Sequence, residues 1–277
     1  MTHGRWLSLR ASTVFAGIGL WAAAAGAQST DTAAGADADL AKQLANPIAA
    51  LISVPLQYNQ DDGFGADGER SALNIQPVIP ISLNADWNVI SRTILPVVDQ
   101  SDLFPGAGSQ SGIGDVVQSF FVSPVEPTAG GWIVGVGPAL LLPTGSETLL
   151  TADQWGLGPT AVALKQQGPW TFGGLTNHLW SVAGEEARRD VSTTLVQPFL
   201  SYITATKTTF AVNTEATYDW EGEQWSVPIN FTVSQLLKLG GQPLSVSAGA
   251  RYWAESPANG PEGWGLRLGI TLLFRKR

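Results

Sequence analysis

The chain has 277 residues, of which 15 are Lys or Arg and 23 are Asp or Glu, giving a formal charge of −8. This acidic balance disfavours nucleic acid as a partner, and the lack of cysteine excludes disulfides and thiolate metal sites. With only two histidines in the chain, we expect neither a metal site nor a bound cofactor.

The N-terminus carries an export signal. Arg5 and Arg10 precede an apolar run over residues 11–25, which ends in the small-residue site Ala25-Gly26-Ala27. An uncleaved membrane anchor is the alternative, but no basic stop-transfer flank follows the run. We therefore predict a signal peptide over 1–27 and export into the periplasm.

Residues 28–45 are small and polar, and 38–44 have the composition of one or two helical turns. Isolated helices this short are marginal in water. We interpret 28–45 as a periplasmic leader that lies near the mouth of the domain formed by 46–277.

From residue 46 onward the polarity alternates with a period of two. In 73–83 the odd positions are apolar, whereas Asn74, Gln76 and Ser82 lie on the other face. Segments of 9–11 residues with one polar and one apolar face are typical of membrane-spanning strands. The predicted strands are 46–60, 70–84, 86–98, 113–125, 130–142, 153–167, 169–183, 190–204, 207–220, 223–238, 242–254 and 262–274.

The connections between these strands alternate between two classes. One set is mostly short, and the other is mostly longer and often acidic, including 60–69 and 99–112. Short periplasmic turns alternating with longer outer loops are characteristic of bacterial outer-membrane barrels. An even strand number places both termini in the periplasm.

Tryptophan occurs at the strand ends. Indole partitions to the membrane–water boundary, so two such groups predict the aromatic girdles of a barrel. One group is Trp87, Trp132 and Trp170, and the other is Trp155, Trp180, Trp220, Trp225, Trp253 and Trp264. A soluble β-sandwich is the alternative, but its tryptophans would gather in a core.

Eight prolines fall inside predicted strands: Pro55, Pro77, Pro80, Pro96, Pro138, Pro159, Pro198 and Pro228. Proline cannot donate to a strand ladder, so bulges or kinks in the wall are expected. The alternative hypothesis is a weakened wall that opens laterally to release an apolar solute into the membrane.

Strand parity places Arg92, Glu215, Arg251 and Arg267 inside the barrel. Either they are ion-paired filling of the wall, or they form a net positive constriction that selects anionic or polar aromatic solutes. The other expected pore-lining residues are Asn74, Gln76, Gln118, Asn230 and Thr232. Ile90, Ile94 and Phe121 on the same face are bulky enough to block the lumen.

No catalytic constellation is evident. His178 and Ser181 are neighbours in the sequence, but in a strand they point to opposite faces and cannot pair. We therefore expect no enzymatic activity and assign His178 to the membrane interface beside Trp180.

Several segments resemble a family of predicted bacterial outer-membrane transporters, whose members carry labels such as "pathway of phenol degradation", "transporter" and, misleadingly, "neuromedin U". The segments that carry the resemblance are 73–80, 91–96, 158–165, 177–184, 197–202, 218–221, 225–230 and 249–257. They occur in order, and the resemblance covers about 40–277. It implies an outer-membrane barrel that moves small, including aromatic, solutes, without established catalytic residues.

The C-terminal strand resembles the signal read by the barrel-assembly machinery, because its apolar residues alternate and end on Phe274. Three basic residues follow, whereas the usual signal ends on the aromatic residue.

We predict an all-β, 12-stranded antiparallel transmembrane barrel in a Gram-negative outer membrane, surrounded by lipid. The predicted function is passive passage of small solutes. A plugged structural or interaction barrel is the first alternative, and a lipid-modifying barrel enzyme the second.

Overall fold

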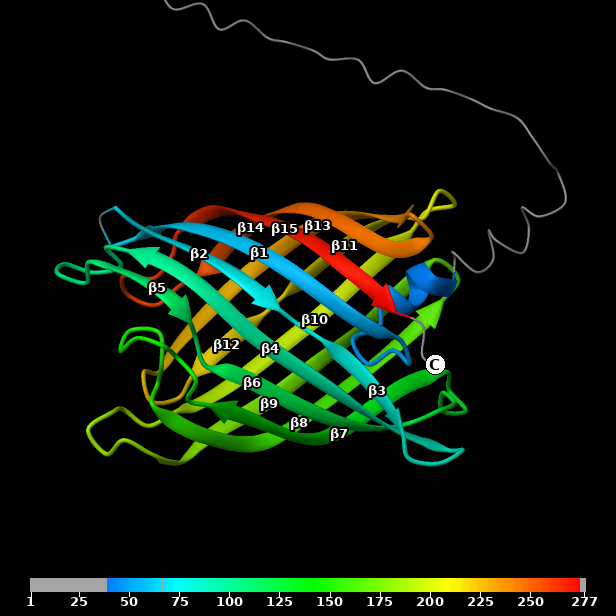
Figure 1. The fold of residues 1–277 in the computed structure, drawn as a ribbon, viewed down its shortest axis with the longest axis horizontal. Coiled ribbons are helices and arrows are strands. Elements are labelled where there is room, and N and C mark those ends of the chain that lie inside the picture. The colour runs from blue at the N-terminus through cyan, green and yellow to red at the C-terminus, as the bar shows by residue number, and fades with distance from the viewer. Residues whose placement is uncertain (1–38, 66, 275–277) are drawn as a thin grey trace, which may run out of the picture.

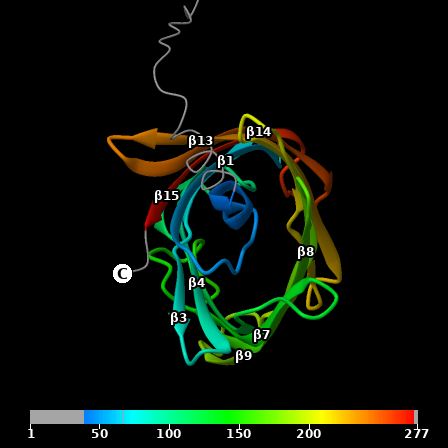
Figure 2. The ribbon, with the colours of Figure 1, turned by 90° about the vertical axis from the view of Figure 1, so that its right-hand side faces the viewer.

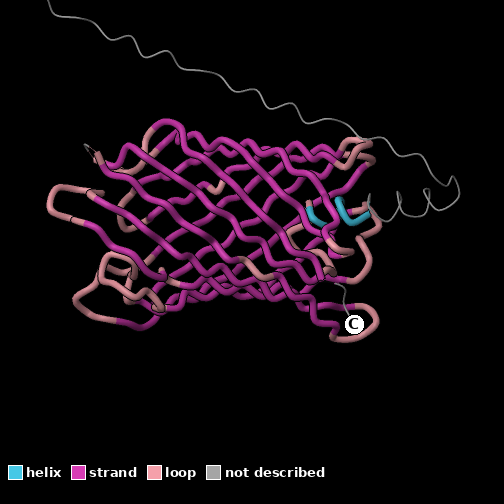
Figure 3. The backbone as a smooth tube through the Cα atoms, turned by 45° about the horizontal axis from the view of Figure 1, so that its top comes forward, coloured by secondary structure: helices cyan, strands magenta, loops and turns pink. Residues whose placement is uncertain are grey.

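The computed structural model describes residues 39–65 and 67–274. The predicted signal peptide, the first part of the leader and the basic residues after Phe274 lie outside the described residues. The described chain forms one antiparallel sheet that closes into a barrel of strongly tilted strands (Figures 1 and 3).

Fifteen strand segments make up this sheet in the described ranges. In chain order they are β1 (Ile52–Phe64), β2 (Gly68–Ile75), β3 (Val78–Ser82), β4 (Trp87–Ser101), β5 (Ser109–Ile113), β6 (Val116–Pro124), β7 (Trp132–Leu142), β8 (Gln154–Gln167), β9 (Trp170–Gly184), β10 (Ser192–Ile203), β11 (Thr208–Thr214), β12 (Ala216–Asp219), β13 (Gln224–Leu239), β14 (Gln242–Glu255) and β15 (Gly263–Phe274).

Three pairs of segments are single strands with a short interruption. β2 and β3 are separated by 76–77, β5 and β6 by 114–115, and β11 and β12 by Glu215. Each pair lies between the same neighbours, so the barrel has twelve strands, as predicted. β1 pairs with β15, and β9 pairs with β10, which closes the ring.

Several boundaries differ from the predictions, and the predicted 99–112 loop is shortened to 102–108 by β4 and β5. The first strand begins at Ile52 rather than at residue 46, because 46–51 turn into the barrel, where Ile48 and Ala49 are buried. The first outer connection is short, because β1 and β2 remain paired up to Phe64 and Gly68 through a bulge. The expectation of a long 60–69 loop was therefore wrong.

The outer surface of the barrel is apolar, as period-two patterning predicts. On β15, the side chains of Trp264, Leu266, Leu268 and Ile270 are 41–63% exposed, whereas Arg267 between them is only 4% exposed. Alternate residues therefore face opposite sides of the wall, one towards lipid and the other towards the lumen.

Eight of the nine tryptophans in the described residues are exposed on this outer surface, in agreement with two aromatic girdles. Trp253 is the exception, because it lies on the luminal face, where its indole Nε1 donates to Asp61 Oδ1 at 2.8 Å. The assignment of Trp253 to a girdle was wrong.

Some of the strand prolines coincide with irregular pairing. Pro138 and Pro159 lie opposite each other on β7 and β8. Beside them, the β8–β9 pairing is interrupted between Leu157 and Thr160, and at Pro228 the register shifts by a bulge. Regular pairing resumes on both sides of these interruptions, so a lateral opening stays a hypothesis.

A short helix, residues 39–44, precedes the barrel, in agreement with the predicted helical turns. It lies inside the ring of strands, at the end of the barrel that carries the short turns (Figure 2). We call 39–51 the leader segment. Within the described ranges there is no helix of the length and apolar character needed to cross a membrane.

Candidate functional site

The leader segment is fixed inside the barrel by both apolar and polar contacts. Ala41, Ile48 and Ala49 are 2%, 3% and 6% exposed. The side-chain amide of Gln166, on β8, donates to the carbonyl oxygen of Lys42 at 2.7 Å. The segment therefore occupies part of the lumen at the end of the barrel that carries the short turns, rather than lying only near the mouth.

One side of the lumen is filled by apolar side chains. Ile48 of the leader segment packs there against residues of β3, β4, β6, β8 and β9. The members of this apolar cluster are Ile48, Val78, Ile90, Phe121, Val162, Leu164 and Leu175. Ile90 and Phe121, which were predicted to be bulky luminal residues, are 1% and 0% exposed within this cluster.

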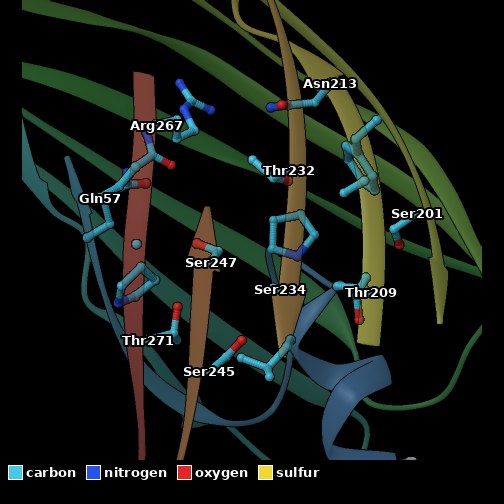
Figure 4. Close-up of a pocket in the computed structure, with 18 of the residues that line it drawn as sticks. Gln57, Ser201, Thr209, Asn213, Thr232, Ser234, Ser245, Ser247, Arg267 and Thr271 are labelled. Atoms are coloured by element: carbon cyan, nitrogen blue, oxygen red, sulfur yellow. The ribbon is translucent and has the colours of Figure 1, made fainter. Parts of the chain in front are cut away.

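The other side of the lumen contains a polar cavity of about 320 Å³. The leader segment bounds it at one end, and β1, β10, β11, β13, β14 and β15 form most of its wall. Seven hydroxyl residues line it: Ser201, Thr209, Thr232, Ser234, Ser245, Ser247 and Thr271 (Figure 4). Four amides, Gln57, Gln76, Gln197 and Asn213, also line it, and Phe199 is the one aromatic side chain among its described lining residues.

An ion pair forms part of the lining of this cavity. Arg267 Nη1 and Nη2 donate to the two carboxylate oxygens of Glu215 at 3.0 and 2.8 Å. Arg267 Nε also donates to Asn59 Oδ1 at 2.8 Å, so the guanidinium is held on two sides. Glu215 comes from the interruption between β11 and β12, and β13 and β14 separate it from β15.

Arg251 extends this network towards the outer end. Its Nη1 lies 3.1 Å from Asp61 Oδ2, and its Nη2 lies 4.0 Å from Glu215 Oε2. The guanidinium carbon lies 4.5 Å from the ring centroid of Trp253, in a cation–π contact. Asp61 and Trp253 belong to this cluster, although the sequence had assigned one to an outer loop and the other to a girdle.

Arg92 differs from the other two predicted arginines. Its Nη2 donates to Gln76 Oε1 at 3.1 Å, and it lines the cavity. Among the described residues, no carboxylate lies within 4.0 Å of it, whereas Arg251 and Arg267 are both ion-paired. The predicted charge cluster therefore consists of paired arginines and one arginine with spare donors.

A further luminal arginine was not predicted. Arg70, on β2, is the register partner of Asp61 and shares its face of the wall. Arg70 is the first residue of the predicted strand 70–84, and sequence parity with Asn74 places it on the luminal face, but its partner Asp61 lay in the predicted 60–69 loop. The luminal arginines are Arg70, Arg92, Arg251 and Arg267, against the carboxylates of Asp61 and Glu215, so positive charge is in excess.

The predicted pore-lining amides are distributed unevenly. Gln76 lines the cavity, and Asn74 lies on the luminal face opposite Gln57. Asn230 is fully buried between its register partners Asn213 and Arg251, and its amide has no hydrogen-bond partner among the described residues.

Gln118 does not face the lumen. Its side chain is hydrogen-bonded to Ser91 and Thr93 on the neighbouring strand. These residues flank Arg92, which points inward, so Gln118 lies on the outer face of the wall. Its prediction as a pore-lining residue was wrong.

His178 and Ser181 have separate partners. His178 Nδ1 lies 2.7 Å from Thr194 Oγ1, and its ring packs 4.0 Å from that of Trp180. Ser181 Oγ donates to Asp190 at 2.9 Å. The two side chains do not meet, and no group of three or more potential metal ligands occurs in the described part of the chain.

Comparison with solved structures identifies several bacterial outer-membrane barrels. The crystal structure of the COG4313 outer-membrane channel from Pseudomonas putida F1 is 17% identical, with TM-score 0.63 over 81% of this chain and 96% of that chain. The chain has an outer-membrane barrel fold. The NanC porin is 12% identical (TM-score 0.47; 81% and 100% covered). Outer-membrane phospholipase A from Escherichia coli is 9% identical (TM-score 0.44; 80% and 92% covered).

Likeness at these identities concerns the fold alone. No protein family profile and no curated protein matches the chain.

Proposed function

We propose that this protein is a channel of the Gram-negative outer membrane that lets small anionic solutes pass by diffusion. The observation that carries this proposal is the polar cavity with Arg92 in its wall. A cation whose donors are mostly free attracts anions, in the way that rings of charged side chains set selectivity in pores.

The distribution of charge supports anions over cations. Luminal arginines outnumber luminal carboxylates in the described strands, and both carboxylates are already bound by arginine. An anion entering the lumen therefore meets a positive potential, and the low-dielectric wall strengthens it.

The surroundings of the barrel follow from its outer face. The apolar belt between the tryptophan girdles matches the hydrocarbon layer of a membrane, so lipid is the proposed partner of this surface. The C-terminal strand, with its alternating apolar residues and terminal Phe274, is the proposed recognition element for barrel assembly.

A plugged barrel without transport is the second candidate, and one observation favours it. The leader segment and the apolar cluster together close part of the lumen at the periplasmic end. A lipid-modifying enzyme receives no such support, because His178 and Ser181 have different partners.

Conductance of the refolded mature protein in planar bilayers under a salt gradient tests the proposal. Discrete channels with a reversal potential that indicates anion preference are the expected result. Arg189→Gln is the control for Arg92→Gln, because Arg189 lies in an outer connection, bound to Asp219, and not in the cavity. A correctly folded but silent barrel rejects the channel and favours a plugged scaffold or a lateral route.

A further inference from the structure

We propose that the luminal cavity is a binding site for a small hydroxylated carboxylate, of the chemical class of sugar acids. This inference rests on the proposed channel function and adds the class of solute. Its elements are one arginine for the carboxylate and a wall of hydroxyl groups for the rest of the molecule.

The carboxylate end is assigned to Arg92. A guanidinium has five N–H donors in a planar fork that matches the two oxygens of a carboxylate. Arg92 uses one nitrogen for Gln76. Arg267, by contrast, has all three of its nitrogens bound to Asn59 and Glu215, so it has little capacity for a ligand.

The hydroxyl residues form one continuous wall of the cavity. Thr209 is the register partner of Ser234, Ser234 of Ser247, and Ser245 of Thr271, so the hydroxyls run across neighbouring strands (Figure 4). A hydroxyl both donates and accepts, so this wall matches a molecule that carries several hydroxyls.

Ser201 provides an independent sign that this wall receives a polar ligand. Its side chain lines the cavity, the residue is only 6% exposed, and its Oγ has no hydrogen-bond partner among the described residues. A buried polar group without a partner costs free energy, which a hydroxylated ligand would recover.

The same lining disfavours an aromatic solute, which the family resemblance had included. Phe199 is the one aromatic residue among the described lining residues, and an unsubstituted aromatic ring offers the hydroxyls no partner. Sites built to hydrogen-bond a ligand reject analogues that lack the matching groups. The volume of about 320 Å³ is at the lower end of ordinary small-molecule sites, which suits a molecule of monosaccharide size.

Equilibrium binding to the refolded mature protein in detergent micelles tests the site without any requirement for transport. The probes are glucuronate, which has both features, glucose, which lacks the carboxylate, and benzoate, which lacks the hydroxyls. We expect saturable binding of glucuronate, about tenfold or more tighter than that of either other probe.

Substitutions then separate the two halves of the site. Arg92→Gln should weaken the binding of glucuronate about tenfold or more and leave the affinity for glucose unchanged. Arg92→Lys should restore part of the loss, because the charge returns without the fork. The double variant Ser247→Ala with Thr271→Val should weaken the binding of glucuronate and leave the affinity for benzoate unchanged. The control Arg189→Gln should leave the affinities for all three probes unchanged. Heat-modifiable gel mobility confirms that each variant is folded.

The two proposals fail in different ways. If no probe binds saturably, or if benzoate binds as tightly as glucuronate, the sugar-acid site is rejected even where the protein conducts ions. If glucuronate binds as expected but bilayers show no channels, the channel is rejected and the site stands as that of a binding barrel.

Discussion

Arg267 and Glu215 are joined by two parallel N–H···O bonds, although two further strands lie between the strands that carry them. The bond is therefore a chord across the lumen rather than a contact along the wall. Because Arg251 and Asp61 adjoin it, the chord ties β1, β14 and β15 to the interruption between β11 and β12. It links these strands across the polar side of the lumen.

Removing the acidic partner of this chord should destabilise the barrel. Glu215→Gln leaves Arg267 as a charge that is only 5% exposed, and breaking such a pair costs about 3 kcal/mol. Guanidinium-induced unfolding in micelles measures the change in the free energy of unfolding. The double variant Arg267→Met with Glu215→Leu should recover much of the loss.

Glu186→Gln is the matched control, because Glu186 is exposed in an outer connection. If Glu215→Gln and this control unfold at the same denaturant concentration, the chord does not contribute to stability.

Arg92 should determine charge selectivity more than the paired arginines do. We expect Arg92→Gln to shift the reversal potential towards cations, by roughly fivefold in permeability ratio, because one unpaired charge in a narrow lumen is worth about 1 kcal/mol. The charge-balanced double variant Arg267→Gln with Glu215→Gln should change the ratio much less. A larger change in the permeability ratio for the double variant than for Arg92→Gln would show that the Arg267–Glu215 pair sets the selectivity instead.

The leader segment should limit conductance. Ile48→Asp introduces a carboxylate into the apolar cluster, where Ile48 is 3% exposed, so the segment should leave the lumen. Single-channel conductance should rise relative to the unmodified protein. Ala50→Asp is the control, because Ala50 is exposed and lies only two residues away. Equal conductance of all three proteins would show that the segment does not restrict the path.

The placement of Trp253 makes a spectroscopic prediction. Trp264 is 63% exposed on the outer face, whereas Trp253 binds Asp61 within the lumen. In vesicles of brominated lipid, Trp264→Phe should therefore reduce the fraction of fluorescence that the lipid quenches, and Trp253→Phe should not. Equal reductions in the quenched fraction for the two variants would show that Trp253 lies in the aromatic girdle and contacts lipid.

The strand count could be predicted because lipid and lumen impose opposite polarity on alternate residues. That constraint is local and acts along every strand, so even the interrupted strands β2–β3 and β11–β12 read as single segments. Position 46 was misassigned because the burial of Ile48 depends on Ile90 and Phe121, which are remote in the sequence.

The charge cluster could be predicted only in part. Parity placed Arg251 and Arg267 on the luminal face, but which carboxylate meets which arginine depends on how the strands are staggered around the barrel. Asp61 was missed because the pairing of β1 and β2 extends past the expected loop.

Gln118 shows a different limit of prediction from sequence. Gln118 and Phe121 are three residues apart, so in a regular strand they point to opposite faces. Both types of residue occur on either face of a barrel, and the alternation over this stretch is too weak to choose between them. The structure assigns Phe121 to the lumen and Gln118 to the outside.

The apolar cluster and the hydroxyl-lined cavity occupy different sides of one lumen. The apolar cluster lies mainly on β3, β4, β6, β8 and β9, and the hydroxyl residues lie on β10, β11, β13, β14 and β15; Arg92 on β4 and Phe199 on β10 link the two sides. Substitutions at Ser245 or Thr271 are free to alter which molecules are accepted while the packing around Phe121 stays intact. In a barrel divided in this way, solute specificity can change during evolution while the packing that stabilises the fold is retained.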